Sequence, residues 1–322
     1  MKRTNGNQQS SQGFTIIELL TVMSIIVILI SLLTPALNRV RRYSTDVKQR
    51  AQFHSIGVAL DLFSNENEGY PNSARLDTAT VPLEYCGAMK LAEAMVGQDL
   101  KGFNPVSRFR QDGMDGDVLP QTNLYPPINM PTPAEYAENV KSRRTYLELE
   151  RANAYQLKDI YDLTAINTAG YLQSSLVLCD SYNRVTNKTT GKKIGMPILY
   201  YKADTAKSFY PDPNVASATM VTDAPVKYIY NHGDNQQLID MGMPWYTGAT
   251  PPVHPLASTG TTPEGKVVTA APDIWPALFY KIVRDKKISS DDKPYKADSY
   301  ILISAGFDGE YGTSDDIYNF GD

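Results

Sequence analysis

The chain has few of the residues that usually carry chemistry, with two cysteines and three histidines among 322 residues. The cysteines, Cys86 and Cys179, form no Cys-x-x-Cys pair and no Cys/His cluster, which argues against a zinc or redox site. If this part of the chain lies outside the cytoplasm, a disulfide between the two can form. Two separate buried thiols are the alternative, and the spacing alone leaves both open.

The motifs of common catalysts are also missing. The sequence has no Gly-x-Ser-x-Gly elbow, no phosphate-binding Gly-rich loop and no His-Glu-x-x-His pattern. His54 falls in a helical pattern, where it is a packing or surface residue, and His232 with Asp234 fits a turn as readily as a catalytic pair. Trp245 and Trp275 could form an apolar binding face, although core packing is more usual. We therefore predict that the chain is not an enzyme.

Excess charge is missing as well, since the formal net charge is −4. A weakly acidic chain is a poor candidate for nucleic-acid binding as its main role. The apolar fraction of 42% and the charged fraction of 20% are ordinary for a folded protein, and the length allows one or two globular units.

The sequence has a single long hydrophobic run, and this run indicates where the chain can cross a membrane. From Phe14 to Thr34 there are 21 residues, and Glu18 is the only ionisable side chain among them. As an α-helix this stretch would be about 30 Å long, the thickness of a hydrocarbon core. Because a soluble helix is rarely apolar on all faces for so long, we predict that residues 14–35 cross a membrane.

Glu18 is the exception within this run. A carboxylate in an apolar segment costs several kcal/mol unless it is paired or protonated, so it marks a functional site. A cut between Gly13 and Phe14 would create an ammonium group four residues before Glu18. In neighbouring helices shifted along their axis, the amine of one copy could neutralise the carboxylate of the next and so set the stagger of an assembly.

These residues carry a family resemblance. The segment Gly13-Phe14-Thr15-Ile16-Ile17-Glu18-Leu19-Leu20, after a short polar leader, resembles the class III signal of type IV pilins and type II secretion pseudopilins. The resemblance implies that a prepilin peptidase cleaves after Gly13 and N-methylates Phe14, and that Glu18 guides subunits into a helical filament. An ordinary signal peptide or an uncleaved signal anchor is the alternative, but the cleavage site of a signal peptide would follow the apolar region rather than precede it.

The resemblance also implies a domain plan. Residues 1–13 are a cleaved leader, 14–35 the transmembrane and polymerisation helix, 36–67 an amphipathic continuation of that helix, and 68–322 a globular head. The continuation has an apolar stripe at helical spacing, formed by Phe53, Ile56, Leu60 and Phe63.

Membrane orientation is ambiguous by charge alone, because basic residues flank both ends of the apolar run, namely Lys2, Arg3, Arg39, Arg41 and Arg42. The resemblance favours a single-pass inner-membrane protein with a cytoplasmic N-terminus and a periplasmic head.

For the head we predict an α+β fold in which the long helix packs on a small antiparallel sheet with large helical and loop insertions. The patterns predict helices over residues 83–100, from 132 towards 151, over 156–166 and over 274–284. They predict strands over 171–179, 196–202, 227–230 and 299–304, and a long loop over 102–130. Thr132, Pro133 and Glu135 form a helix-start signature.

A second chemical site is predicted in the acidic loop 304–317, which holds Asp308, Asp315 and Asp316 among several glycines. Calcium takes six to eight oxygen ligands in flexible geometry, and a Gly-rich acidic loop can supply them, although the pattern is not an EF-hand. A solvated acidic turn is the alternative. The loop resembles the C-terminal calcium loop of the major pseudopilin, which implies Asp308 and Asp315 as carboxylate ligands. Asp316, Ser314 and the carbonyl of Ala305 are further candidates, and the ion would be structural.

The resemblance as a whole implies a structural subunit of a type II secretion system that assembles into a short filament driving protein export. Its partners would be further copies or other pseudopilins, the prepilin peptidase and the inner-membrane assembly platform. A minor type IV pilin for adhesion or DNA uptake is one alternative. A membrane-tethered binding module or hydrolase is another.

Overall fold

The computed structural model describes residues 15–74, 85–116, 121–126, 132–211, 220–246, 252–268, 276–288 and 293–321. The chain divides into two compact units, Met1–Thr45 and Asp46–Asp322. The predicted leader, with Gly13, lies outside the described residues, and so does Phe14.

One long helix, α1 (Ile16–Glu66), contributes to both units and confirms the predicted N-terminal helix. Pro35 lies inside this helix. The helix ends because Asn67 bonds back to the carbonyl of Phe63 through both its backbone and its side chain, and Glu68 takes a left-handed conformation with φ 57°. A left-handed residue just past the last turn is a common helix stop.

In the second unit, one face of α1 is buried in the head, which confirms the predicted amphipathic half. Its buried residues are Gln49, Gln52, Phe53, Ile56, Ala59, Leu60 and Phe63. The two glutamines satisfy backbone groups of the head. The amide of Gln52 donates to the carbonyl of Cys179 at 2.9 Å, and the Gln49 oxygen accepts from the N–H of Ser181 at 2.8 Å.

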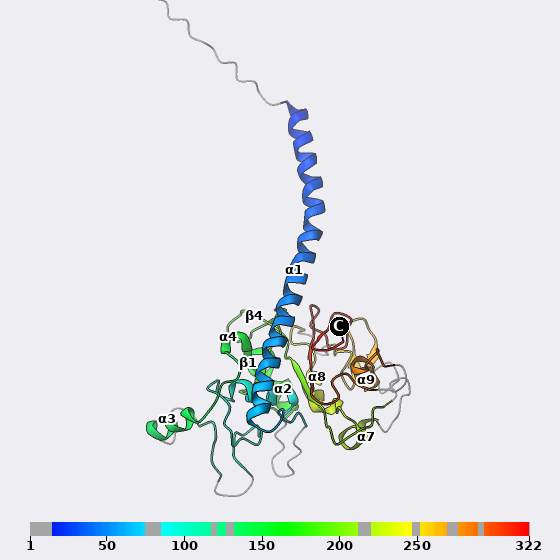
Figure 1. The fold of residues 1–322 in the computed structure, drawn as a ribbon. Coiled ribbons are helices and arrows are strands. Elements are labelled where there is room, and N and C mark those ends of the chain that lie inside the picture. Colours follow the sequence, from blue (N-terminus) through cyan, green and yellow to red (C-terminus); the bar gives the residue numbers. More distant parts are fainter. Residues whose placement is uncertain are drawn as a thin grey trace, which may run out of the picture. The chain divides into compact units, whose positions relative to one another are not determined.

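The sheet under this helix has three antiparallel strands in the order β5-β8-β9, namely β5 (Leu199–Lys202), β8 (Tyr300–Ser304) and β9 (Ile317–Tyr318). Figure 1 shows α1 in blue as one long helix. Leu199 pairs with Ile303 and Ser304 with Ile317. Alternate residues of β5 and β8 belong to two different apolar clusters. Tyr200 and Leu302 lie in the cluster that contains α1, and their neighbours lie in the other. Successive strand residues point to opposite faces, so both faces of the sheet are covered.

The rest of the head consists of short elements around this sheet. The helices are α2 (Gly87–Val96), α3 (Pro133–Lys141), α4 (Leu149–Ala152), α5 (Leu157–Ile160), α6 (Leu163–Thr168), α7 (Met220–Lys227), the 3-10 turn η1 (His232–Asn235), α8 (Gln236–Asp240) and α9 (Ala277–Val283). The strand pairs are β1 (Ala154–Gln156) with β2 (Leu176–Leu178), β3 (Val185–Thr186) with β4 (Lys193–Ile194), and β6 (Gly260–Thr261) with β7 (Val267–Val268). This arrangement confirms the predicted α+β, pilin-like fold.

Several predicted elements differ in extent. The helix predicted from 132 towards 151 begins as expected, with Thr132 accepting a hydrogen bond from the N–H of Glu135, but α3 ends at Lys141. It ends there because Arg144 pairs with the backbone of Phe103 and draws the chain back to the head. The helix predicted over 156–166 is split into α5 and α6, because the two residues between them, Tyr161 and Asp162, are extended.

Two predicted strands differ from the structure, one in length and one in kind. Of the strand predicted over 171–179, β2 retains three residues. The strand predicted over 227–230 is wrong, because α7 runs to Lys227 and Tyr228 makes only an isolated bridge with Phe209. Tyr228 is instead held by aromatic packing. Its ring lies edge-on to Tyr280 and is stacked with Phe209.

Candidate functional site

The first candidate site is the start of α1, where Thr15 and Glu18 satisfy each other. The N–H of Thr15 donates to Glu18 Oε2 at 2.9 Å, and the Thr15 hydroxyl donates to the same oxygen at 2.6 Å. In return, the N–H of Glu18 donates to the Thr15 hydroxyl at 3.3 Å. This is a capping box, with Thr15 as N-cap and Glu18 as the third helical residue. Glu18, the only acid of the apolar run, thus accepts hydrogen bonds from a residue of its own chain.

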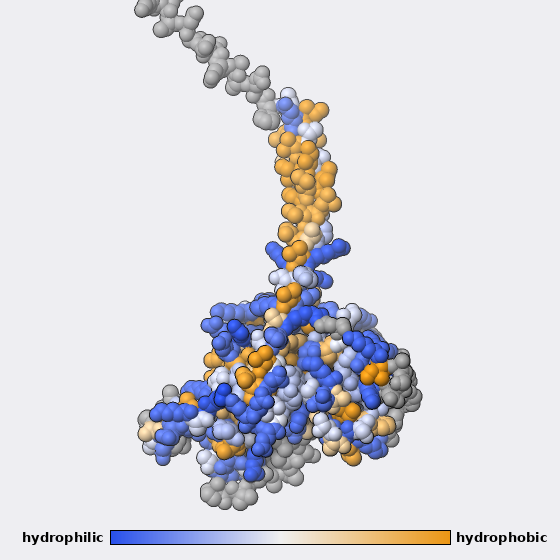
Figure 2. Space-filling model, viewed as in Figure 1, coloured by the Kyte–Doolittle hydropathy of each residue, from blue (hydrophilic) through white to orange (hydrophobic). Residues whose placement is uncertain are grey.

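The following turns of α1 form the one helix, among the described residues, that is long and apolar enough to cross a membrane. Apolar side chains cover this part of the helix in Figure 2. Three of its hydroxyls donate to carbonyls of the same helix, at 3.0 Å for Thr21 to Ile17, 2.7 Å for Ser31 to Ile28 and 2.9 Å for Thr34 to Ile30. Such bonds satisfy these hydroxyls without water, as a membrane interior requires. Length, composition and internal hydrogen bonding therefore all fit a membrane anchor.

The second candidate site is the loop between β8 and β9, where two predicted calcium ligands come together. The carboxyl groups of Asp308 and Asp315 contact each other, and the N–H of Asp308 donates to Asp315 Oδ2 at 2.9 Å. Burial, together with the contact to Asp315, raises the pKa of Asp308 to about 6. Burial acts against ionisation of Asp315, but hydrogen bonds from Thr313 and Asp308 outweigh it and lower the pKa of Asp315. A pair of this kind favours a bound cation or a proton.

Two further acids of this loop each have a buried oxygen without a hydrogen-bond partner, Asp316 Oδ1 and Glu310 Oε2. The other oxygen of Asp316 accepts from the N–H of Gly312 at 2.8 Å and from the Tyr318 hydroxyl at 3.0 Å. Burial raises the pKa of Glu310 to about 7, and the charge of Asp308 adds to the effect. Buried oxygens without partners are costly, so this loop would gain from a compensating positive charge.

The other two predicted ligands, Ser314 and the carbonyl of Ala305, belong to residues that differ in exposure. Ser314 is exposed, whereas Ala305 is fully buried at the end of β8. Among the residues that the structure describes, no three acidic, histidine or cysteine side chains are grouped closely enough to hold a metal by themselves. A calcium ion here would therefore use the Asp308–Asp315 pair, with carbonyls and water completing its shell.

The acidic loop is pinned to the head by tight packing. Gly309 has φ 78°, and a Cβ there would lie 2.6 Å from the Trp245 ring and 2.7 Å from Arg184. The Arg184 guanidinium lies over the Trp245 ring at 4.7 Å. Trp245, considered above as part of a binding face, thus supports the loop. Trp275 lies outside the described residues.

The two cysteines are both buried and free. Burial raises the pKa of the Cys86 thiol to about 11, and burial also raises the pKa of the Cys179 thiol well above its ordinary value. Of the two alternatives left open by the sequence, two separate buried thiols describe this structure, and the possible disulfide between Cys86 and Cys179 is not formed in it. Both lie in the same apolar cluster, where a thiol serves as a small hydrophobic side chain.

The histidines considered as catalytic candidates have structural surroundings. The imidazole of His232 lies 3.1 Å from the Tyr280 hydroxyl, and Asp234 accepts from the Ser73 hydroxyl at 2.5 Å. His254 is fully buried, donating to the carbonyl of Gly242 and accepting from the N–H of Tyr311. His54 is exposed on α1. These contacts give each buried histidine a packing role.

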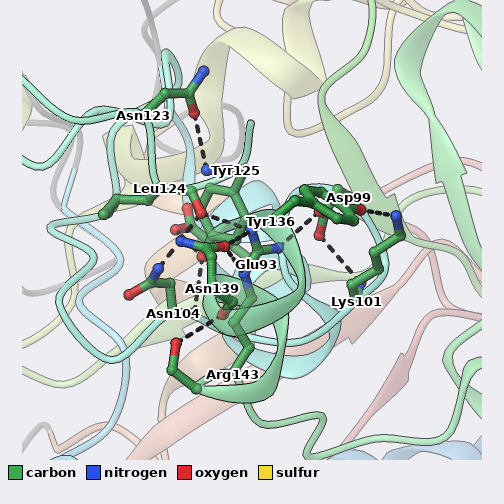
Figure 3. A network of polar contacts seen from close by, with 11 residues as sticks. Glu93, Asp99, Lys101, Asn104, Asn123, Leu124, Tyr125, Tyr136, Asn139 and Arg143 are labelled. Atoms are coloured by element: carbon green, nitrogen blue, oxygen red, sulfur yellow. Dashed lines mark hydrogen bonds and ion pairs between the residues drawn. The ribbon is translucent and has the colours of Figure 1, made fainter. Parts of the chain in front are cut away.

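Sequence reasoning missed a polar network around Glu93, a fully buried residue of α2 (Figure 3). Its carboxylate accepts from the hydroxyls of Tyr85 and Tyr125 at 2.7 and 2.9 Å, and also from Ser107 and Gln98. With four donors the carboxylate is saturated, so the network ties the loop after α2 to the core. The available signal was a charged pair, Lys90 and Glu93, inside an otherwise apolar helix.

A neighbouring network holds α3. Arg143 pairs with Asp99 at 2.7 Å, donates to the carbonyl of Leu124 at 2.8 Å and lies over the Tyr125 ring (Figure 3). Its side chain is buried, so this ion pair is shielded from screening by salt.

Comparison with protein families matches residues 8–34 to the prokaryotic N-terminal methylation motif. The chain carries a type IV pilin-like prepilin signal. The signal implies processing by a prepilin peptidase and pilus-like assembly in a membrane, and with the apolar helix it indicates membrane anchoring. The match ends before the head. No match to the chain was found among curated proteins or among solved structures.

Proposed function

We propose that the chain is a pseudopilin-like, non-enzymatic subunit of a type II secretion system, anchored in the inner membrane with its head in the periplasm. The observation that carries this proposal is the prepilin signal together with a membrane-length apolar run, residues 14–34, in which Glu18 is the only acid. In this role the chain performs mechanical work by assembling into a short filament. The head supplies the surface of that filament.

Glu18 supplies the register of the assembly in this proposal. Cleavage after Gly13 gives each copy an ammonium group at Phe14, and apolar surroundings strengthen its attraction to a carboxylate. The capping box with Thr15 holds the acid at the helix start, where a neighbour's amine can reach it. A prepilin peptidase, other pseudopilins or further copies, and an inner-membrane assembly platform are the partners that this role needs.

Glu18→Ala should abolish assembly while leaving cleavage intact, because it removes the partner of the new amine but no residue at the cut. Filaments are scored by electron microscopy of material released from lysed cells, and the mature N-terminus by mass spectrometry. Thr21→Ala is the matched control, since Thr21 is another polar residue of the span whose hydroxyl bonds only within its own helix.

Normal filaments from the Glu18→Ala chain would contradict the role of Glu18, and a mature protein that begins at Met1 would contradict the proposal as a whole. The same strain separates the two pilin-like functions. Loss of protein export supports secretion, whereas intact export with lost adhesion or DNA uptake supports a minor type IV pilin.

We further propose that calcium binds the 304–317 loop. Asp308 and Asp315 would supply carboxylate oxygens, and Asp316, Ser314 and the carbonyl of Ala305 are candidates for the rest. Support comes from the contact between the two carboxyl groups and from the buried unpartnered oxygens beside them. The ion would hold the last strand, β9, against β8, so that metal binding and folding are linked.

Calcium should raise the melting temperature of the wild-type chain, because an ion that binds only the folded state stabilises it by mass action. The double variant Asp308→Ala, Asp315→Ala should melt lower than wild type in calcium but not in chelator. Thermal melting in calcium and in EGTA measures both effects. An identical wild-type melting temperature in the two buffers would remove the calcium site.

A further inference from the structure

The head has a polar pocket at the edge strand β5. Residues of three segments line it, namely 72–74, 202–207 and 225–234. Its volume is about 480 Å³, which lies within the range of small-molecule sites in proteins. None of its lining residues belongs to α1 or to the 304–317 loop. The pocket is therefore separate from the two candidate sites described above.

An acid, Asp234, is fixed in the wall of this pocket. Its Oδ2 accepts from the Ser73 hydroxyl at 2.5 Å, and the same hydroxyl accepts from the N–H of Lys202 at 2.9 Å. The next residue, Asn235, donates from its side chain to the carbonyl of Tyr200 at 2.8 Å. These bonds tie η1 to β5, so the carboxylate is held in place before any ligand arrives.

The other oxygen of this acid is unsatisfied. Asp234 is 3% exposed, and its Oδ1 has no hydrogen-bond partner. The buried ammonium of Lys90 donates instead to the carbonyl of Ala74. Burial raises the pKa of Asp234 to about 6, so the acid is mostly ionised at neutral pH. A buried, ionised oxygen without a partner costs free energy, which a ligand that donates a hydrogen bond to it would recover.

The other charged residues of the lining are a satisfied pair and one cation. Lys207 pairs with Asp204 at 2.9 Å and also donates to the carbonyl of Pro225 at 2.8 Å. Lys202 is close enough to lower the pKa of Asp204, but its ammonium forms no ion pair among the residues that the structure describes. The lining thus has two lysines and two acids, and one group of each sign lacks an ionic partner.

This balance decides the class of ligand. A ligand with several charges of one sign finds no net charge to oppose it, and a neutral sugar leaves the charges of Asp234 and Lys202 without ionic partners. A molecule with one ammonium and one carboxylate satisfies both. Tyr228 and Ile229 add apolar lining, and the Tyr228 ring is held edge-on by Tyr280.

We propose that this pocket binds a small zwitterion, an α-amino acid or a short peptide, with its ammonium group on Asp234 and its carboxylate on Lys202. The aliphatic part of the ligand lies against Tyr228 and Ile229. This binding needs neither a filament nor protein export, so it goes beyond the proposed function and gives the head a small-molecule site of its own.

Thermal melting and titration calorimetry of the full chain in detergent test the site, with the standard L-amino acids and their glycyl dipeptides as probes. A binding zwitterion at about 100 times its Kd should raise the melting temperature by about 5 °C. Its N-acetyl form lacks the ammonium group and its amide lacks the carboxylate, so neither should bind. A response to dipeptides alone identifies a peptide as the occupant.

Variants of the two charged residues give the second test. Lys202→Met should weaken binding at least about tenfold, because the ligand carboxylate loses a charged hydrogen-bond donor. Lys192→Met is the matched control, since Lys192 is an exposed lysine outside the pocket lining, and it should bind like wild type. Asp234→Asn should abolish binding. If that variant does not fold, Lys202→Met and the two blocked forms of the ligand still decide the question.

Three results would overturn the proposal: no binding of any zwitterion at millimolar concentration, equal binding of the N-acetyl or amide form, or unchanged affinity in Lys202→Met. Binding of glucose or putrescine in place of every zwitterion would overturn it as well. Lys202→Met should still form filaments, so a failure of this site leaves the proposed function in place.

Discussion

Single residues in the head show how far burial changes their acid–base behaviour. Burial lowers the pKa of His232 to about 4 and raises that of Asp180 to about 7. In both cases the low-dielectric surroundings disfavour the charged form. The two shifts change stability over nearly the same pH range, from about 4 to about 7, but in opposite directions. Asp180 stabilises the fold fully only below its unfolded pKa near 4, and this contribution is lost as the pH rises through 7.

His232 contributes in the other direction. Its folded pKa lies below the ordinary value of 6.5, so its contribution is complete above pH 6.5 and is lost as the pH falls towards 4. His232→Gln should therefore flatten the acid side of the stability profile and reduce the loss of unfolding free energy between pH 7 and pH 4 by about 3 kcal/mol. Urea unfolding at a series of pH values measures this.

His54→Gln is the control for that series, because His54 is exposed and its replacement should leave the profile unchanged. If the unfolding free energies of His232→Gln and wild type fall equally between pH 7 and pH 4, a group other than His232 causes the loss of stability in acid.

Among the elements, the connection between β2 and β5 requires the backbone of Gly195 to lie close to the backbone of Asp180. A Cβ on Gly195 would lie 2.0 Å from the carbonyl oxygen of Asp180 and 2.3 Å from its Oδ1. The Asp180 carboxylate accepts from the N–H of Met196 at 3.1 Å and from the Ser304 hydroxyl at 2.8 Å. This cluster therefore joins β2, β5 and β8.

Gly195→Ala should cost about 3 kcal/mol of unfolding free energy, because the new methyl group can fit only if the backbone moves. Gly116→Ala is a matched control, since nothing lies within 4 Å of a Cβ there and its φ is not positive. Chemical denaturation of the two variants compares them. Equal stabilities would mean that the 180–195 contact is looser than described.

The elements that sequence could predict are those whose signal is local. The length of α1 follows from apolar periodicity and from the chain-breaking residues after Glu66, and β8 follows from its buried Tyr-Ile-Leu-Ile run. The extents of α3 and β2 were missed because contacts distant in sequence set them. Arg144 is drawn to Phe103, and the chain before β2 turns rather than pairing.

Across the whole molecule, the candidate sites also differ in whether residues close in sequence or contacts distant in sequence form them. The prepilin signal is contiguous, so residues 8–34 carry it without help from the fold. The acidic loop could be predicted as a site, but the pairing of Asp308 with Asp315 depends on how the loop closes. The saturation of Glu93 by four donors from three segments could not be predicted, because its partners lie up to 32 residues away along the chain.

The exposure of helix α3 has a practical consequence. Among its residues with described side chains none is buried, and it is held to the head by Arg143, just beyond its end, and by Tyr136, whose hydroxyl accepts from Lys101. Replacing its exposed residues would thus remove nothing from either apolar cluster. The sequence of this helix is free to drift, and an epitope tag grafted onto it would mark the protein without disturbing its interior.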